Sequence, residues 1–360
     1  MTNFNNFYKN KTVLVTGHTG FKGSWISIWL LHLGAKVIGY SLDPYTPKDN
    51  FVVTDLAHKM VDIRGDIRDF EKFNSIVDQY KPEIIFHLAA QPIVRLSYDI
   101  PRETIETNVM GTTNILESFR RSQSAKILVI ITSDKCYENK EWIWGYRESD
   151  PVGGYDPYSA SKGAIELLSS AYMRSFFKPK DFKKHGKVVA TVRAGNVIGG
   201  GDWAKDRIIP DCVRALEKDR PIEVRNPQSV RPWQHVLEPL NGYLLLASKM
   251  YEDPEKYSGA WNFGPDPESI ITVKEVVEKV IKYYGKGTWK DKSNPDEVHE
   301  AKLLNLDTSK ARFVLGWKPK FGVNEAIKMT VEWYKKYQFE QMFNFSSQQI
   351  EKFSSCNKET

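Results

Sequence analysis

The segment GHTGFKG, residues 17–23, directly follows a short apolar, β-branched run at residues 12–16 and opens a helical stretch. Glycines at this spacing let the backbone turn sharply and approach a pyrophosphate, and the helix N-terminus offers unpaired N–H donors to its charge. A glycine-rich turn without a ligand is the alternative, but the strand–turn–helix order favours a ligand. The sequence therefore predicts a dinucleotide site with contacts from Gly17, Thr19, Gly20, Phe21 and Gly23.

Strand-like and helix-like segments alternate along the first half of the chain. The runs at 35–40, 84–88, 127–132 and 188–193 read as strands, several of them buried on both faces, and helical patterns lie between them. This alternation predicts an α/β fold with a doubly wound parallel sheet of the Rossmann type. After about Asn196, Gly and Pro become frequent and the elements shorten, which predicts a smaller, mixed α/β C-terminal substrate domain.

The same pattern gives the expected domain boundaries. A dinucleotide-binding domain is expected at residues 1–195, with the chain returning to it around 235–265. The substrate domain is expected at 196–337. Residues 338–360 form a polar tail that is expected to fray or to add a peripheral helix.

Composition excludes several classes of protein. The chain has 360 residues and a net charge of +6, but its basic and acidic residues are mixed, which does not favour a nucleic-acid partner. Cys136, Cys212 and Cys356 lie far apart without a C-x-x-C spacing, so we expect neither disulfides nor a metal site. No signal peptide or bilayer-spanning run is visible, so we expect a cytoplasmic protein without a membrane partner.

A second motif, YSASK at residues 158–162, carries catalytic side chains. A helix would place Tyr158 and Lys162 on one face, and a nearby cation lowers the pKa of a phenol. Tyr158 is therefore expected to act as a base on a hydroxyl near neutral pH. Ser133 ends a buried run and would hydrogen-bond the reacting oxygen, although a serine at such a place is often only a helix cap.

The spacing G-x-x-G-x-x-G, with the Tyr158/Lys162 pair, resembles the extended short-chain dehydrogenase/reductase family. That resemblance implies further cofactor contacts from Asp66, Ile67, Leu88, Ala89, Ala90 and Asn108, besides Tyr158 and Lys162. An acid at the end of the second strand should bind the ribose 2′-OH of NAD. Here Asp43 arrives late, but no Arg sits beside it in the sequence to receive a 2′-phosphate, so NAD is expected rather than NADP.

The segment TSDKCY, residues 132–137, adds an acid and a base directly after Ser133. This pattern is similar to that of the nucleotide-sugar 4,6-dehydratases, where an Asp is usually followed by Glu. Lys135 in place of that Glu resembles the branch of the family that acts on CDP-glucose, and TSDKCYEN, GNVIGGGDW and RPWQHV match it too. The resemblance implies that Asp134 assists loss of the C6 oxygen. It also implies that Lys135, as a neutral amine made so by burial and by positive charge such as Lys162, removes the C5 proton.

Three alternatives stay open from the residues. A nucleotide-sugar 4-epimerase or a decarboxylase would use Ser133, Tyr158 and Lys162 but would not need Asp134 with Lys135. A non-enzymatic dinucleotide sensor would not need the Tyr158/Lys162 pair. A 4,6-dehydratase for a dTDP or GDP sugar would differ in contacts to the nucleotide base, although Lys135 argues against both.

The resemblance also implies how a substrate, CDP-glucose, is held. Its expected contacts are Gln91, Ser133, Asn196, Arg207, Arg231, His235 and His299. A structural hydrogen bond competes with the substrate role of His235, and core packing competes with base stacking for Trp203 and Trp233. Helices at 112–121 and 161–176 are expected to form a homodimer interface, and 6-deoxyhexose synthesis for surface polysaccharide such as lipopolysaccharide O-antigen is the implied context.

Overall fold

The computed structural model describes residues 4, 6–293 and 303–356, and within these ranges its centre is a seven-stranded parallel sheet. The strand order is β11-β6-β5-β4-β1-β2-β3, and every pair is parallel. The strands are β1 (Thr12–Thr16), β2 (Lys36–Ser41), β3 (Val61–Arg64), β4 (Ile84–His87), β5 (Ile127–Ile131), β6 (Val188–Ala194) and β11 (Gly259–Phe263). The expected fold class is confirmed, and each expected run lies in a strand within one or two residues of the expected bounds.

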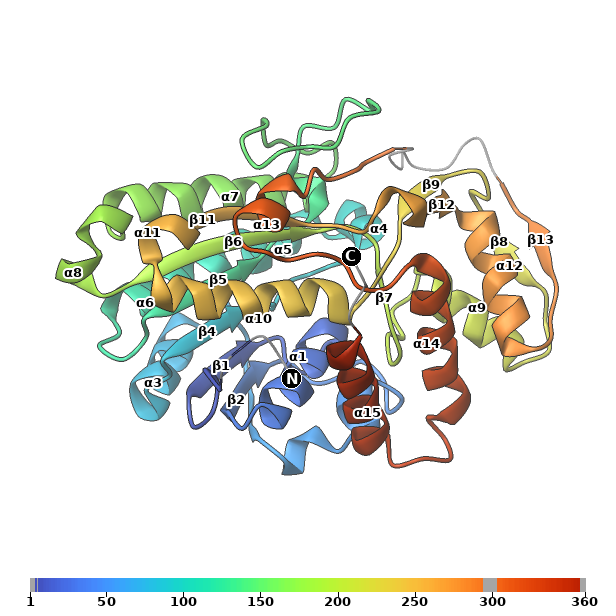
Figure 1. Cartoon of the computed structure of the whole chain (residues 1–360), viewed down its shortest axis with the longest axis horizontal. Helices are drawn as coiled ribbons and strands as arrows, with labels where there is room; N and C mark the ends of the chain where they lie inside the picture. Colours follow the sequence, from blue (N-terminus) through green and yellow to red (C-terminus); the bar gives the residue numbers. More distant parts are fainter. Residues whose placement is uncertain (1–3, 5, 294–302, 357–360) are drawn as a thin grey trace.

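Helices cover both faces of the sheet, which is why its central strands are apolar on both sides. Val13 and Val15 of β1 pack into one core cluster, while Leu14 between them packs into the other. The first face is covered by α1 (Phe21–His32) and α10 (Leu237–Glu252). The second is covered by α3 (Phe70–Tyr80), α6 (Gly111–Arg121) and α7 (Pro157–Ser175). Figure 1 shows α7 and α10 on opposite sides of β6.

Shorter helices connect these layers. Between β2 and α6 the chain forms α2 (Asn50–Val53), α4 (Val94–Asp99), α5 (Pro101–Ile105) and one π-helical turn (Glu106–Met110). Single 3₁₀ turns lie at Leu56–His58, Asp134–Cys136, Pro179–Asp181 and Pro267–Ser269. The helices α8 (Phe182–His185) and α11 (Pro254–Tyr257) flank β6 and β11.

The C-terminal half forms small two-stranded sheets beside the main one. These pair β7 (Val197–Ile198) with β10 (Gln234–His235), β9 (Val230–Pro232) with β12 (Ile270–Thr272), and β8 (Ile222–Val224) with β13 (Trp289–Asp291). The helices here are α9 (Ile208–Leu216), α12 (Val273–Tyr284), α13 (Ser309–Phe313) and α14 (Val323–Lys336). In the main sheet, Trp261 of β11 pairs in register with Val192 of β6. The two-domain division itself stays a prediction.

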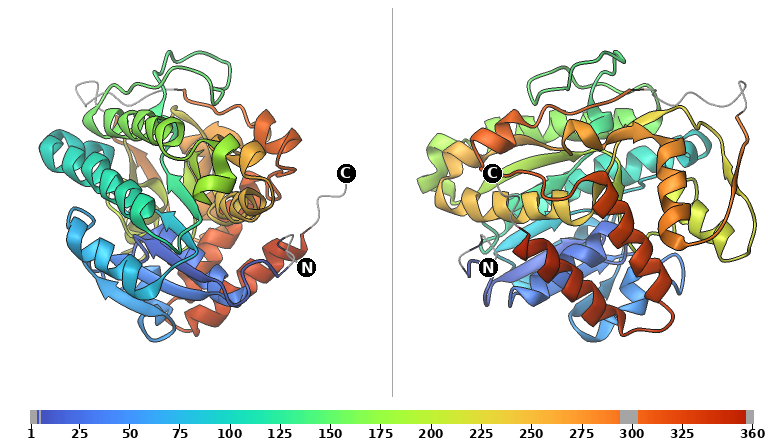
Figure 2. Two further views of the ribbon diagram at one scale, coloured as in Figure 1. Left: turned by 90° about the vertical axis from the view of Figure 1, so that its left-hand side faces the viewer. Right: turned by 45° about the vertical axis from the view of Figure 1, so that its right-hand side comes forward.

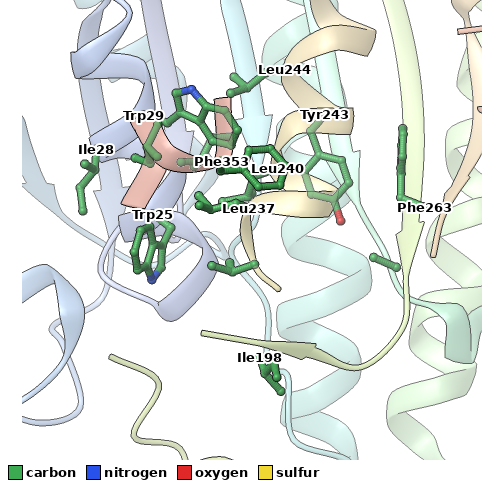
Figure 3. Packing of buried hydrophobic residues seen from close by; sticks show 14 of the residues in the cluster. Trp25, Ile28, Trp29, Ile198, Leu237, Leu240, Tyr243, Leu244, Phe263 and Phe353 are labelled. Atoms are coloured by element: carbon green, nitrogen blue, oxygen red, sulfur yellow. The ribbon is translucent and has the colours of Figure 1, made fainter. Parts of the chain in front are cut away.

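The chain's last helix, α15 (Met342–Ser355), packs against the first one. Ile350 and Phe353 are fully buried, and the Phe353 ring meets Trp29 of α1 edge-on at 5.7 Å between ring centroids. Figure 2 shows α14 and α15, in red, against the N-terminal part of the chain, in blue, and Figure 3 shows Trp29 beside Phe353. The polar-looking tail therefore contributes apolar side chains at helical spacing to the core. Among the described residues, no helix is long and apolar enough to cross a membrane.

Candidate active site

A cavity of about 1230 Å³ opens at the carboxyl ends of the central strands. The residues that follow β1, β4, β5 and β6 line one side, and residues from β8, β9 and α9 line the other. Ligands of open parallel sheets bind at this edge, where the order of strands reverses. The volume exceeds the roughly 300–1,000 Å³ that suits one small ligand, so the cavity can take two.

The glycine turn lines this cavity, and a side chain would not fit at Gly17 or at Gly23. Gly17 has a φ of +74°, and a Cβ on it would lie 2.7 Å from the backbone nitrogen of Ala89. A Cβ on Gly23 would lie 2.0 Å from the carbonyl oxygen of Gly17. The turn therefore leads straight into α1 with its backbone accessible, as a bound pyrophosphate requires. The other predicted dinucleotide residues that line the cavity are Thr19, Gly20, Phe21, Asp66, Ile67, Leu88, Ala89, Ala90, Tyr158 and Lys162.

A hydrogen-bond network that sequence reasoning missed holds the turn after β4. The imidazole of His87 lies 2.7 Å from the Thr16 hydroxyl on one side and 3.0 Å from the Thr112 hydroxyl on the other. The same Thr16 oxygen accepts hydrogen bonds from the backbone N–H groups of Leu88 and Ala89. Burial lowers the pKa of His87 to about 3, so the ring is neutral and acts as a fixed connector.

The expected cofactor contact of Asn108 needs correction. Asn108 is 1% exposed and does not line the cavity. Its Oδ1 accepts from the backbone N–H of Gln91, and its Nδ2 donates to Ser161 Oγ at 2.8 Å. Ser161 Oγ donates in turn to the Tyr158 carbonyl oxygen. Asn108 is therefore a positioning residue, because it ties the turn after β4 to the first turn of α7.

The adenosine end of the cavity carries more charge than the sequence suggested. Asp43 lines the cavity, but an arginine does lie beside it, since Arg64 Nε of β3 is 3.6 Å from its carboxylate. Arg64 also pairs with Asp62 at 2.8 Å, so two carboxylates flank this guanidinium. A 2′-phosphate here would meet both negative charges. Asp66 pairs with Arg68 at 2.6 Å, and hydrogen bonds from Arg68 hold the pKa of the Asp66 carboxyl below its usual range.

Tyr158, Lys162 and Ser133 converge in the cavity. Asp156 caps α7 by accepting from the backbone N–H of Ser159, which starts the helix just before Tyr158. Lys162 is buried, with its Nζ 3.5 Å from the Ile131 carbonyl oxygen and 5.8 Å from the centre of the Tyr158 ring. Burial lowers the pKa of Lys162 to about 8.

The pKa expected for Tyr158 from the sequence also needs correction. Burial raises the pKa of Tyr158 to about 12, and this outweighs the lowering by the hydrogen bond with Ser133 and by the charge of Arg207. Desolvation penalises a phenolate, so the protein alone does not make this phenol acidic. Charge brought by a ligand has to supply the rest. Arg207, which was expected to contact the substrate, is one of the charges that lower the pKa of the phenol.

Asp134 and Lys135 form the acid–base pair beside this group. Both lie in the 3₁₀ turn after β5, and Ser133 Oγ donates to Asp134 Oδ1 at 2.9 Å. Lys135 Nζ donates to the same oxygen at 3.3 Å. Asp134 is 2% exposed, whereas the Lys135 side chain is 34% exposed, so the burial expected around the Lys135 amine is not what the structure shows. Gly195 lets the acid approach β6, because a Cβ there would lie 3.1 Å from Asp134 Oδ2.

A buried ion pair, which the sequence analysis did not identify, fixes α7 against the sheet. Arg193 of β6 donates from Nε and Nη2 to the two oxygens of Glu166, at 2.9 and 2.8 Å. Thr132 and Thr191 donate to the same carboxylate, so all its partners are charged or hydroxyl donors. Glu166 stands one helical turn after Lys162, which offered a signal: a four-residue spacing from the catalytic lysine.

Of the substrate residues expected from the sequence, most line the cavity, one lies outside the described residues, and one is buried away from the cavity. Gln91, Asn196, Arg207 and Arg231 line the cavity, and Trp203 and Trp233 line it as well. Arg207 Nη1 pairs with Asp202 Oδ2 at 2.7 Å, and Gln91 Nε2 donates to the Ile93 carbonyl oxygen in its own loop and to the Thr104 hydroxyl of α5. His299 lies outside the described residues.

The residue buried away from the cavity is His235, whose substrate contact is corrected. Its side chain is fully buried and outside the cavity lining. The ring lies between those of Trp25 and Phe321, at 6.2 Å from each centroid. Burial lowers its pKa to about 3, so it is a neutral core residue.

The model of the GDP-mannose 4,6 dehydratase family matches residues 14–330, which include the sheet and both sides of the cavity. The chain belongs to this family. The resemblance drawn from the glycine turn and from TSDKCY is thereby confirmed.

Individual proteins are similar to this chain over 90% or more of its length. The CDP-glucose 4,6-dehydratase of Salmonella typhimurium is 50% identical over 352 residues, which cover 98% of either chain. A UDP-glucuronate 4-epimerase of Thermodesulfobacterium geofontis is 25% identical over 90% of this chain and 96% of its own. The solved dTDP-glucose 4,6-dehydratase of Bacillus anthracis, in complex with NAD, has a TM-score of 0.74, 22% identity and coverage of 92% of this chain and 99% of its own. At that identity the likeness shows the shared fold of the family.

Proposed function

We propose that this chain is an NAD-dependent lyase that converts CDP-glucose to CDP-4-keto-6-deoxyglucose and water. The observation that carries the proposal is the 50% identity, over 98% of both chains, with a CDP-glucose 4,6-dehydratase. The cavity supports it, because Asp134 and Lys135 lie beside Tyr158 at one strand end. A 4-epimerase would have no use for that second acid–base pair.

The first step oxidises C4 of the sugar. In this proposal Tyr158 removes the proton from the C4 hydroxyl, and Ser133 hydrogen-bonds the same oxygen. NAD, when bound, would supply the acceptor for the C4 hydride and its return to C6, and the base that removed the C5 proton would then give it back to C5. The glycine turn and the network of Thr16 and His87 hold the walls of the cofactor site in place for this exchange.

The second step removes water. A 4-keto group acidifies the C5 proton, which the Lys135 amine takes, while Asp134 protonates the departing C6 hydroxyl. These roles need a neutral amine and a protonated acid at the same moment. The two groups are joined by a 3.3 Å hydrogen bond, so they can act on neighbouring atoms of the sugar from one place in the cavity.

NAD rather than NADP is supported by the two carboxylates that flank Arg64. We also propose a cytoplasmic homodimer that supplies 6-deoxyhexose precursors for surface polysaccharide such as O-antigen. Support for the dimer comes from apolar side chains exposed on and just beyond α7: Leu167 is 62% exposed and Phe176 is 48% exposed.

The deciding experiment uses CDP-glucose that carries deuterium at C4. The purified protein is incubated with it and NAD, and products are analysed by mass spectrometry and NMR. We expect a product lighter by one water with the deuterium at C6. An unchanged mass with inversion at C4 would identify a 4-epimerase instead, and reaction with dTDP- or GDP-linked sugars alone would reassign the substrate.

A further inference from the structure

Lys22 is a cavity residue to which neither the motifs nor the proposed chemistry gives a role. It is the second residue of α1 and stands inside the glycine turn, between Phe21 and Gly23. Its ammonium group makes no hydrogen bond or ion pair with any residue of the described ranges. A cation on a helix N-terminus is itself unfavourable, because the helix dipole is positive there. A lysine in this place therefore needs a compensating anion.

The charges around Lys22 do not supply that anion. Arg207, Lys162 and Lys135 act on it as like charges, and Asp134 is the acid that acts in the opposite direction. Asp134 already accepts hydrogen bonds from Ser133 and Lys135, as described above. Burial, followed by the charge of Arg207, lowers the pKa of Lys22 to about 8. Asp134 thus lies among several cations, one of which, Arg207, also pairs with Asp202 at 2.7 Å.

We propose that Lys22 binds a diphosphate group in this cavity, and that the group is the pyrophosphate of the dinucleotide. A diphosphate supplies a charged partner for the Lys22 ammonium, which is a point-charge partner for phosphate. The dinucleotide is favoured as its source because the backbone of Lys22 belongs to the turn built for that pyrophosphate. The diphosphate of the nucleotide sugar is the other source of the same chemistry. The proposal rests on the proposed function, since both ligands follow from it.

The test measures binding without turnover. NAD and CDP are titrated separately by calorimetry into the wild-type protein and into Lys22→Met, which keeps the length of the side chain and removes its charge. We expect the Kd for NAD to rise about tenfold or more, with the Kd for CDP within about twofold of wild type. Lys22→Arg should keep most of the affinity. Lys36→Met is the matched control, because Lys36 is exposed at the start of β2, outside the cavity lining.

Proton uptake gives a second readout that a structural defect would not imitate. An anion raises the pKa of a nearby ammonium, so NAD binding near pH 8 should take up a fraction of a proton, on the order of one half, at Lys22. Calorimetry in buffers of different ionisation enthalpy measures this uptake, and Lys22→Met should lack that share. A raised Kd for CDP instead of NAD would overturn the dinucleotide as the source and assign Lys22 to the diphosphate of the nucleotide sugar.

Two results would overturn the inference. If Lys22→Met binds both ligands as the wild type does, Lys22 has no diphosphate role, and the isotope experiment can still establish the dehydratase. If the wild type binds neither NAD nor CDP, the inference fails together with the proposed function.

Discussion

Polar side chains in and behind this cavity are linked to one another by hydrogen bonds. Ser133 and Lys135 both donate to one oxygen of Asp134, and Asn108 reaches Tyr158 only through the hydroxyl of Ser161. Charged or polar groups buried in this way depend on their partners, because each unpaired group would cost desolvation energy. A substitution in one member therefore tests a specific step of the reaction.

Replacing Lys135 should separate the two halves of the proposed reaction. In Lys135→Ala we expect C4 oxidation to continue while elimination stalls, because the base for the C5 proton is gone. Absorbance at 340 nm after mixing enzyme, NAD and CDP-glucose should still increase in this variant. Product formation should fall at least about 100-fold. Tyr158→Phe is the control, since it should abolish both the absorbance change at 340 nm and product formation. Product formation by Lys135→Ala at the wild-type rate would remove Lys135 from the mechanism.

Local spacing predicted some of these residues, and tertiary contacts decided the others. Tyr158 and Lys162 could be found because their four-residue spacing fixes their geometry before the chain folds. His235 was misread, since no pattern in RPWQHV shows that the ring packs between Trp25 and Phe321, residues more than 80 positions away in either direction. The acidity expected for Tyr158 was wrong for a similar reason: the sequence shows a neighbouring cation but not burial.

At the scale of elements, a second glycine-rich turn, which follows β7 and contains Gly200 and Gly201, contacts three helices. The carbonyl oxygen of Gly200 accepts from Trp25 Nε1 of α1, and a Cβ on Gly200 would lie 1.9 Å from Trp333 Cγ of α14. Gly201 has a φ of +77°, and a Cβ on it would lie 2.4 Å from Asn50 Cβ of α2. The turn after β7 therefore sets how near the C-terminal helices lie to the first one.

Gly200→Ala should destabilise the protein by about 1–3 kcal/mol, because the new methyl group would have to displace the Trp333 ring. Urea denaturation followed by tryptophan fluorescence measures the change in free energy of unfolding. Gly264→Ala is the matched control, since a Cβ there meets only ordinary contacts at 3.4 Å or more. Equal stability of the two variants would mean that the turn moves aside freely.

Elements near the N-terminus were easier to predict than β11 or α15. The runs at 12–16 and 127–132 predict buried strands, because each is an unbroken run of apolar and β-branched residues. By contrast, GAWNF at β11 is short, begins with glycine and is separated from its partner β6 by residues 195–258, so only the folded sheet identifies it. The α15 segment is rich in Ser and Gln, and its buried Phe353 is apparent only from the packing on α1.

At the scale of the whole molecule, the proposed dimer can be tested by one exposed residue. Leu167→Asp places a charge on the outer face of α7, where it would be desolvated in an interface. We expect light scattering to give the mass of a dimer for the wild type and of a monomer for the variant. Phe339→Asp is the control, because Phe339 is 83% exposed after α14. A monomeric wild type would contradict the dimer.

The position of β11 has a consequence for how the protein is made. While the chain leaves the ribosome, β6 is complete well before Gly259–Phe263 exists, and translation of the residues between them takes several seconds at roughly 5–20 residues per second. During that interval β6 is an open edge with unpaired backbone groups, ready to pair with another nascent chain. A shortened product that ends near residue 200 would keep this edge permanently, so the first half of the protein is expected to aggregate when it is produced alone.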